Sequence, residues 1–343
     1  MSRSFQSVAQ CKPSSQADVY IYKIVPVTDS KIAGITSADE LFLVDGQLGS
    51  GTVIQLPGPP KTISTLVTTS DGNGFICAGG SGDVFLYDVR TRERAGKVNV
   101  GKGVTAMSLS GSALAVGTEY VNHQAVVSVW DVRQLSKPQW QNAENHDDIT
   151  AIDFHPSRTN LLLAGGDDGQ VSIFDSTVVE EEDSLVQGLN QGPVHKAGFL
   201  DQSSFYALSS DQNLALHPVF DDTRTEEPKP IDMGDVRPLI PCEYVVDIVK
   251  SGTAATIATG SHSKSRVDLV AIQPDGNFDL QNRIVLEGAH SEEIVRSIFT
   301  SDETGLIYTA GEDGQIQVFR EAAGTSETSS RKSKKEGGRY KPY

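Results

Sequence analysis

Cysteine is scarce in this sequence, and long apolar stretches are missing. The 343 residues include three cysteines, Cys11, Cys77 and Cys242, which are odd in number and far apart. This pattern argues against a disulfide scaffold and a thiolate metal site, and it fits a reducing compartment. No run approaches the ~18 apolar residues of a membrane span, and the first residues show no apolar core of a secretory signal. We therefore expect neither membrane insertion nor secretion.

Basic residues are in the minority. The chain has 29 Lys and Arg against 45 Asp and Glu, which gives a formal net charge of −16. An acidic body repels phosphate backbones, so direct nucleic acid binding by the folded part is disfavoured and basic protein partners are favoured. The alternative is that the acidity serves only solubility.

The end of the chain departs from this balance. Residues 321–343 contain six Lys and Arg against three Asp and Glu, and almost no apolar residues. This composition predicts a disordered basic tail. The RKSKK segment in it resembles a short nuclear localisation signal, although such clusters also occur as solvated tails. We expect a protein of the nucleus and cytoplasm.

A sustained helical periodicity is also missing, and a repeat of strand-like runs takes its place. Runs that end in an aromatic or aliphatic residue and Asp recur as ELFLVD, DVFLYD, VVSVWD and QVSIFD. Their final residues, Asp45, Asp88, Asp131 and Asp175, are 43, 43 and 44 positions apart. Each run follows another apolar run and a glycine-rich turn, with a further strand-like run upstream. LALHPVF, RVDLVAI and QIQVF continue the series to seven units.

Four strands per unit at a period of about 40–45 residues are typical of a β-propeller blade. The sequence resembles the WD-repeat β-propellers, most specifically in NHDDITAIDFHPSRTNLLLAGGDDGQVSIFD and GAHSEEIVRSIFTSDETGLIYTAGEDGQIQVF. The resemblance implies an all-β fold, one seven-bladed β-propeller over residues 4–320. No strand follows QIQVF, whereas SFQSVAQC (Ser4 to Cys11) is available to pair. We therefore expect a ring closed by an N-terminal strand that completes the last blade.

A histidine, a threonine and an aspartate in the last unit, His290, Thr309 and Asp313, could be taken for a catalytic triad. In the WD-repeat family, residues at these positions form a structural hydrogen-bond network that a tryptophan completes. Phe319 takes the place of the tryptophan and cannot donate an indole N–H bond. The resemblance therefore implies a buried structural network that stops at Asp313–His290–Thr309.

The fourth unit offers a reduced form of this set. His146 and Asp168 occupy the matching positions, while Ala164 removes the hydroxyl group. We expect these residues, too, to be buried and structural.

No enzymatic motif competes with the structural interpretation. GGSGD (79–83) is a loose match to the G-x-S-x-G nucleophile turn. The seven histidines show neither H-x-x-x-H nor H-E-x-x-H spacing, and no G-x-x-x-x-G-K-[ST] phosphate loop occurs. GGDDG and GEDG lack the later ligands of a calcium loop. The sequence predicts no catalytic residue, no metal site and no cofactor.

Binding is expected at the loops on the two faces of the ring. By family geometry, the loops that lead into the inner strands share one face with the turns between second and third strands. That face would collect the candidate partner-binding residues Glu119, Tyr120, Asp147, Asp148, Asp167, Glu292, Glu293, Arg296 and Glu312. We favour it because short loops preorganise a surface, although long acidic loops on the opposite face leave the choice open.

The function predicted from these features is a non-enzymatic scaffold, a monomer within a larger complex, that binds a Lys/Arg-rich segment. It would act as a chaperone or escort of a ribosomal protein, a histone or another nuclear protein. The alternative comes from VWDVR, which looks like the W-D-x-R box through which some propellers dock on a cullin-type ubiquitin ligase adaptor. Asp131 and Arg133 would make that contact, with Asp88 and Arg90 as a second copy, unless each arginine merely pairs with its aspartate.

Overall fold

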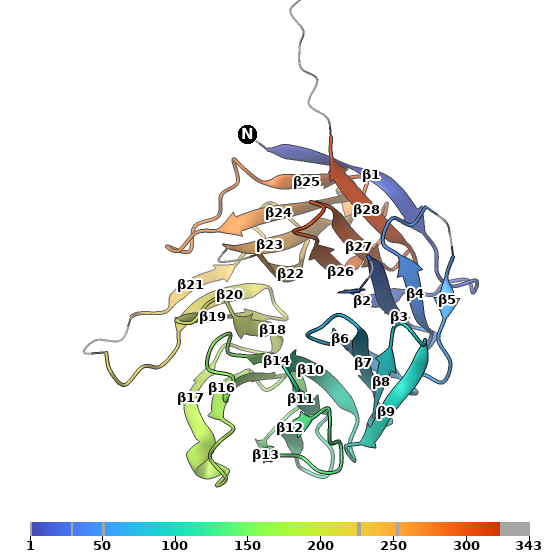
Figure 1. Ribbon diagram of the computed structural model, residues 1–343. Helices are drawn as coiled ribbons and strands as arrows, with labels where there is room; N and C mark the ends of the chain where they lie inside the picture. The colour runs from blue at the N-terminus through green and yellow to red at the C-terminus, as the bar shows by residue number, and fades with distance from the viewer. Residues whose placement is uncertain (1, 29, 50–51, 225–227, 252–253, 323–343) are drawn as a thin grey trace, which may run out of the picture.

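The computed structural model describes residues 2–28, 30–49, 52–224, 228–251 and 254–322. Within these residues the chain forms β-strands and two 3-10 helices, η1 (Glu182–Ser184) and η2 (His262–Lys264), and no α-helix. The described strands assemble into five four-stranded sheets and one eight-stranded sheet. The sheets follow one another around a ring (Figure 1). The all-β propeller that the sequence predicts is confirmed.

We number the four-stranded groups as blades in chain order. Blade 1 consists of β2 (Ile21–Val27), β3 (Lys31–Thr36), β4 (Leu41–Asp45) and β5 (Ile54–Gln55). Blade 2 consists of β6 (Ile63–Thr68), β7 (Gly74–Gly79), β8 (Asp83–Asp88) and β9 (Glu93–Asn99). Blade 3 consists of β10 (Val104–Ser110), β11 (Ala113–Thr118), β12 (Ala125–Asp131) and β13 (Trp140–Asn145).

The next two blades have the same order. Blade 4 consists of β14 (Ile149–Phe154), β15 (Leu161–Gly166), β16 (Gln170–Asp175) and β17 (Leu185–Asn190). Blade 5 consists of β18 (Val194–Phe199), β19 (Ser204–Ser209), β20 (Asn213–Pro218) and β21 (Ile231–Asp235).

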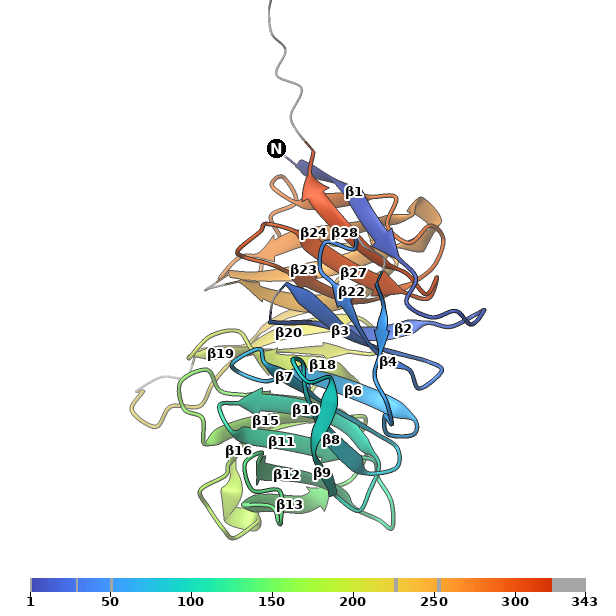
Figure 2. The same cartoon turned by 45° about the vertical axis from the view of Figure 1, so that its right-hand side comes forward.

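The eight-stranded sheet holds the other two groups. Blade 6 consists of β22 (Tyr244–Ser251), β23 (Ala254–Ser261), β24 (Arg266–Ile272) and β25 (Ile284–Glu287). Blade 7 consists of β26 (Val295–Thr300), β27 (Ile307–Gly311), β28 (Ile316–Glu321) and β1 (Arg3–Cys11). Strand β1 runs antiparallel beside β28, as Figure 2 also shows. Closure of the ring by the N-terminal strand is therefore confirmed.

Strand β1 makes a second pairing that the sequence does not predict. Its first residues, Arg3 to Phe5, run parallel to β25 in blade 6. The N–H group of Arg3 donates to the carbonyl of Arg283 at 2.9 Å. One strand thus joins the outer edge of blade 6 to the outer edge of blade 7, which makes the eight-stranded sheet.

The position of a strand within its blade explains its composition. Figure 1 shows the first strand of each blade nearest the middle of the ring and the fourth at the rim. The second strands β7 and β15 are buried at every residue, because neighbouring blades cover both faces of the sheet. The outer strand β9 is mostly exposed and alternates in burial. The apolar second strands and the polar fourth strands of the sequence repeat follow from this arrangement.

Apolar clusters between neighbouring blades hold the ring together. Ile35 and Leu41 of blade 1 pack with Phe75 and Tyr87 of blade 2 in one such cluster. The rings of Phe75 and Tyr87 stack with their centroids 5.4 Å apart, and both side chains are fully buried. Burial of each large aromatic side chain contributes roughly 1.5–3 kcal/mol.

Glycine is required in the turns that join second and third strands. Gly169 in GGDDG and Gly314 in GEDG adopt φ values of 89° and 71°, a region that side chains with a Cβ avoid. A Cβ on Gly314 would lie 2.4 Å from the carbonyl oxygen of Val19. These turns therefore approach the backbone of the next blade so closely that only glycine fits.

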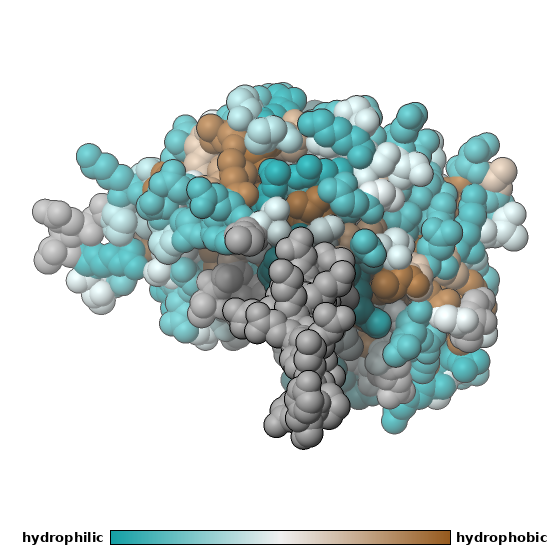
Figure 3. Space-filling view, turned by 90° about the horizontal axis from the view of Figure 1, so that it is seen from above, coloured by the Kyte–Doolittle hydropathy of each residue, from teal (hydrophilic) through white to brown (hydrophobic). Residues whose placement is uncertain are grey.

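The two domain boundaries remain predictions. Strand β28 ends at Glu321, and most of the predicted tail, residues 323–343, lies outside the described residues. Figure 3 shows the molecule from above, and the surface of the described residues there is mostly hydrophilic with small hydrophobic patches. None of the helices in the described ranges is long and apolar enough to span a membrane.

Candidate functional site

The upper face of the ring, as we define it, comprises the loops that lead into the first strands and the turns between second and third strands. One backbone hydrogen bond recurs there, from the turn to the preceding loop of the same blade. The N–H group of Glu119 donates to the carbonyl of Gly103 at 2.9 Å. In the same way Asp167 donates to Asp148 at 3.0 Å, and Glu312 donates to Ile294 at 2.9 Å. These three predicted residues therefore occupy equivalent, backbone-anchored turn positions in blades 3, 4 and 7.

The upper-face residues of blades 3 and 4 form one connected cluster. The N–H group of Tyr120 donates to Oδ1 of Asp148 at 2.6 Å, which links the turn of blade 3 to the loop of blade 4. The N–H group of Asp148 donates to Oδ1 of Asp147 at 2.9 Å, and Oε1 of Glu119 accepts from a backbone N–H at 3.1 Å. The structure thus brings together Glu119, Tyr120, Asp147, Asp148 and Asp167.

A cavity of about 290 Å³ adjoins this cluster between the outer strand of blade 3 and the sheet of blade 4. We call it the acidic groove. Five carboxylic side chains line it: Glu144, Asp147, Asp168, Glu181 and Glu182. The lining residues include His146 and the aromatic ring of Phe174, but no lysine or arginine. Its carboxylates have no basic partner in any described ion pair.

The other predicted residues of the upper face lie in blade 7, and blades 1 and 2 separate them from the acidic groove. Glu292 and Glu293 are exposed. Arg296 on β26 donates from Nε to Oε1 of Glu312 at 2.7 Å. The guanidinium group thus neutralises a neighbouring glutamate, and the predicted residues form two groups instead of one surface.

The polar residues of the last blade form a closed network. His290 is completely buried. Its Nδ1 lies 2.8 Å from Oδ1 of Asp313 and its Nε2 lies 2.8 Å from Oγ1 of Thr309. Phe319, in the place of tryptophan, is also fully buried and adds no polar group. The imidazole has no access to solvent, so this arrangement fastens the turn and leaves no room for a substrate.

The corresponding prediction for blade 4 is wrong. His146 and Asp168 are both exposed, and no described hydrogen bond joins them. Oδ1 of Asp168 instead accepts the N–H of Gln170 at 2.9 Å within its own turn. Ala164 stands where Thr309 stands in blade 7, so a buried imidazole would have lacked a partner for one nitrogen. The histidine turns out to the surface, and the acidic groove occupies its place.

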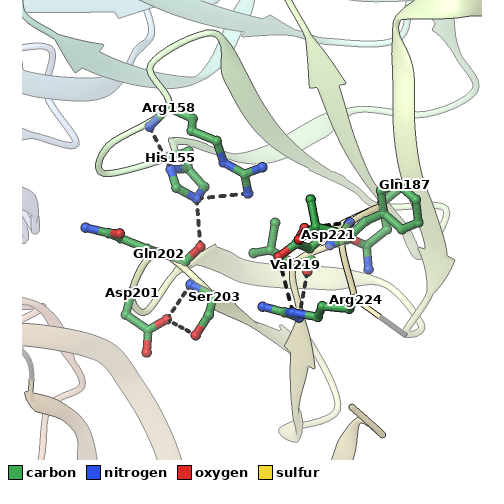
Figure 4. A network of polar contacts seen from close by, with 11 residues as sticks. His155, Arg158, Gln187, Asp201, Gln202, Ser203, Val219, Asp221 and Arg224 are labelled. Carbon is green, nitrogen blue, oxygen red and sulfur yellow. Dashed lines mark hydrogen bonds and ion pairs between the residues drawn. The ribbon is translucent and has the colours of Figure 1, made fainter. Parts of the chain in front are cut away.

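A second histidine network, which the sequence did not reveal, lies on the opposite, lower face (Figure 4). His155 follows β14 and is almost fully buried. Its Nδ1 accepts the N–H of Arg158 at 2.9 Å, and its Nε2 lies 3.0 Å from the carbonyl of Gln202 in blade 5. Burial lowers the pKa of His155, in keeping with a neutral ring that donates from Nε2. The FHP sequence at residues 154–156, for which we predicted no role, is the local pattern that could have indicated this anchor between blades 4 and 5.

The Asp-x-Arg pairs are local structures on the loops. Arg133 donates from Nε to Oδ1 of Asp131 at 2.9 Å, and this hydrogen bond lowers the pKa of Asp131 to about 2. Arg90 and Asp88 repeat the pair at 3.1 Å. A third copy at the end of β21, Asp235 and Arg237 at 2.8 Å, is not one of the residue pairs predicted for docking. Pairing within the turn accounts for all three copies, and ligase docking stays a prediction.

Comparisons with known proteins identify the repeat. The model of the WD domain, G-beta repeat matches residues 139–175, from the outer strand of blade 3 to the third strand of blade 4. The chain is 35% identical over 247 residues to an uncharacterised WD repeat-containing protein of Saccharomyces cerevisiae. The chain thus contains a WD repeat and is similar to WD repeat-containing proteins. That alignment covers 70% of this chain and 62% of the yeast protein, less than two thirds of the relative's length.

Two further WD-repeat relatives align over more of their own length. An uncharacterised WD repeat-containing protein of Schizosaccharomyces pombe is 28% identical over 324 residues, which cover 90% of this chain and 97% of that protein. The WD repeat-containing protein 89 homolog of Dictyostelium discoideum is 20% identical over 271 residues, which cover 76% and 72%. WD-repeat propellers generally act as scaffolds that bind protein partners. Across the described ranges, no three His, Cys, Asp or Glu side chains are placed to hold a metal ion.

Proposed function

We propose that this WD-repeat protein is a non-enzymatic scaffold whose upper face binds a Lys/Arg-rich protein segment, with the acidic groove as the contact for one basic side chain. The observation that carries the proposal is the lining of the groove, which has five carboxylic groups and no lysine or arginine. Several carboxylates attract a cation in the groove at the same time. The net charge of −16 also attracts a basic segment from a distance and so raises its association rate.

The loops around the groove are preorganised for such a contact. The backbone bond from Asp167 to Asp148 and the bond from Tyr120 to Asp148 fix the loops of blades 3 and 4 against each other. The carboxylate of Glu181 accepts the N–H of Ala143 at 2.7 Å and fixes the far wall. A fixed loop loses little conformational entropy on binding, so more of the contact energy is retained as affinity. Phe174 in the lining adds an aromatic surface for the stem of a lysine or arginine.

The experiment measures binding of a fluorescently labelled peptide in which lysine and arginine alternate with glycine and serine. The wild-type chain should bind it at low ionic strength and release it near 1 M salt, where the Debye length falls to about 3 Å. Asp147→Asn and Glu182→Gln should each weaken binding about threefold, as expected for exposed charge pairs.

Two controls make the result decisive. Glu93→Gln removes one exposed carboxylate from the rim strand β9, outside the groove, and should leave the affinity within error of wild type. An uncharged peptide with glutamine in place of lysine and arginine should not bind. Equal weakening by the rim variant, or binding indifferent to salt, contradicts the proposal.

Within this proposal the protein escorts a basic nuclear, histone or ribosomal protein between cytoplasm and nucleus. The support is the sequence RKSKK at 331–335, a composition that import receptors recognise. A fluorescent fusion of the full chain should enter the nucleus, and replacement of the four basic residues in this segment by alanine should leave it in the cytoplasm. Equal nuclear signal for both chains contradicts this part of the proposal.

A further inference from the structure

The first strands of successive blades are tied together by a repeated hydroxyl contact. Each first strand begins with a β-bulge, and the bulged residue is Ser64 in blade 2, Thr105 in blade 3 and Thr150 in blade 4. Thr105 and Thr150 each donate from Oγ1 to a carbonyl at the start of the next first strand, at 2.6 Å in both cases. Ser64 makes the same contact to Val104. We call these contacts the hydroxyl staples.

The staples stop at blade 5. The bulged residue of β18 is His195, and the following blades have Val246 and Arg296 in this place. None of these three side chains forms a described hydrogen bond to the next first strand. Strands β18 and β22 also approach each other less closely than the other neighbouring first strands. The junction between blades 5 and 6 therefore lacks a staple and is also the widest junction between first strands.

A cavity of about 280 Å³ opens at this junction, on the upper face. We call it the junction pocket. Its lining consists of His195, Lys196, Ser210, Gln212, Tyr244, Val245, Val246, Ile294, Val295 and Arg296. Three of these ten residues are basic and none is acidic, which is the reverse of the overall charge of the chain.

Several hydrogen-bond donors of the junction pocket remain available. The hydroxyl oxygen of Tyr244 accepts the N–H of Val295 at 2.8 Å, and no described residue accepts its own O–H. Lys196 uses one N–H on Asp247 at 3.2 Å, and Arg296 uses one edge of its guanidinium on Glu312. The ring of His195 has no described hydrogen-bond partner.

Positive charge in the middle of the ring exceeds the nearby negative charge. Lys23 of blade 1 forms no ion pair within the described residues, while the carboxylates of Asp247 and Asp153 are already paired with Lys196 and Lys250. Limited hydration and the charge of Lys196 lower the pKa of Lys23 to about 8, against a smaller opposite effect of Asp247. Limited hydration and then the charge of Lys196 also lower the pKa of His195, while Asp247 acts in the opposite direction and Arg296 adds a smaller lowering effect.

We propose that the junction pocket binds a phosphate group, held by His195, Lys196 and Arg296 and by the hydroxyl of Tyr244. A phosphate offers three or four acceptor oxygens and up to two negative charges, which match several convergent donors better than the two oxygens of a carboxylate. The pocket is larger than one phosphate, so the group can arrive on a phosphorylated side chain of a partner or on a small phosphorylated molecule. This site takes the opposite charge from the acidic groove and does not depend on the function proposed above.

The test titrates inorganic phosphate into the full chain and follows the imidazole signal of His195 by NMR. We expect a saturable shift and a rise in the pKa of His195, because a bound anion favours the charged ring. The same titration with a capped phosphoserine tripeptide, ribose 5-phosphate and a capped glutamate tripeptide separates the sources. Tighter binding of the phosphoserine peptide than of ribose 5-phosphate supports a phosphorylated partner, and the reverse order supports a small molecule.

Variants connect the signal to the pocket. Arg296→Gln should weaken phosphate binding about tenfold, whereas Arg237→Gln, which also separates an exposed arginine from an acidic partner, should not. His195→Thr introduces the residue that blades 3 and 4 have at the bulge, and it should weaken phosphate binding without lowering the melting temperature. A lack of any saturable shift in the wild type up to about 10 mM phosphate, ten times a Kd of about 1 mM, overturns the proposal. Equal loss in Arg237→Gln, or equal affinity for the glutamate peptide, does so as well.

Discussion

The junction made by strand β1 offers a sharp test of how this propeller closes. Phe5 is buried, with 4% of its surface exposed, and it packs in the cluster that contains Leu286 of blade 6 and Phe319 of blade 7. In the same strand Val8 is the bulged residue opposite β28 and is 51% exposed. Phe5→Ala and Val8→Ala therefore shorten two apolar side chains of one strand in opposite environments.

The structure sets the size of the difference. Truncation of a buried phenylalanine to alanine costs about 3–5 kcal/mol, because transfer energy is lost and a cavity remains. An exposed substitution usually changes the free energy of unfolding by less than about 0.5 kcal/mol. Since whole proteins are stable by only about 5–15 kcal/mol, Phe5→Ala should remove a large share of the total. At about 2 °C per kcal/mol, the melting temperature should fall by about 6–10 °C.

The assay is urea unfolding followed by tryptophan fluorescence, combined with hydrogen exchange of β28. Phe5→Ala should shift the urea midpoint and speed exchange in β28, since loss of β1 exposes an edge strand. The matched variant Val8→Ala should do neither. Equal midpoints for the two variants would refute the reasoning that this strand closes the ring through its buried face.

Three further predictions concern single side chains. Thr309→Ala should lower the free energy of unfolding by about 1–3 kcal/mol because Nε2 of the buried His290 loses its partner; an unchanged urea midpoint would contradict this role. Lys23→Met should stabilise the fold at pH 7, and this gain in the free energy of unfolding should shrink as pH rises from about 8 to 10.5. Over that range the folded protein has lost the proton of Lys23, whereas the unfolded chain still holds it. Urea denaturation of both proteins across this pH range measures the gain. Cys77 is fully buried, and burial raises the pKa of its thiol to about 12. It should therefore resist alkylation at pH 8 until urea unfolds the chain. Alkylation of the native protein as fast as that of the protein in urea would contradict its burial.

Much of the fold was predictable because it is a local pattern repeated along the chain. The spacing of Asp45, Asp88, Asp131 and Asp175 reports the third strands of blades 1 to 4. The missing strand after QIQVF and the spare strand at Ser4 to Cys11 indicate how the ring closes. Both signals depend on strand length and turn composition, which short stretches of sequence encode directly.

The state of each polar site was harder to predict because it depends on residues from other strands. His290 and His146 occupy similar sequence positions, yet the hydroxyl of Thr309 is present beside one and absent beside the other. The sequence records that difference as Ala164, but it does not show that His146 lines a groove between blades 3 and 4. The junction pocket left a weaker signal, the loss of a hydroxyl residue at the bulge positions from His195 onward. Its meaning depends on the staples of blades 2 to 4, which only the structure displays.

The two candidate sites place opposite charges on different parts of one ring, and they differ in whether staples tie the neighbouring blades. The acidic groove lies where Thr105 and Thr150 tie blades 3, 4 and 5 together, so its walls have fixed positions before a partner arrives. The junction pocket lies where no hydroxyl ties blade 5 to blade 6, and basic side chains from β18 and β26 face the opening. An anion there would accept hydrogen bonds from blades 5, 6 and 7 together and would replace the missing staple by charge-assisted contacts. The free energy of such a contact is also free energy of folding, because the unfolded chain has no site. A ligand of the junction pocket would therefore tighten the ring at its least connected junction, while the groove would bind its basic partner without any rearrangement of the blades.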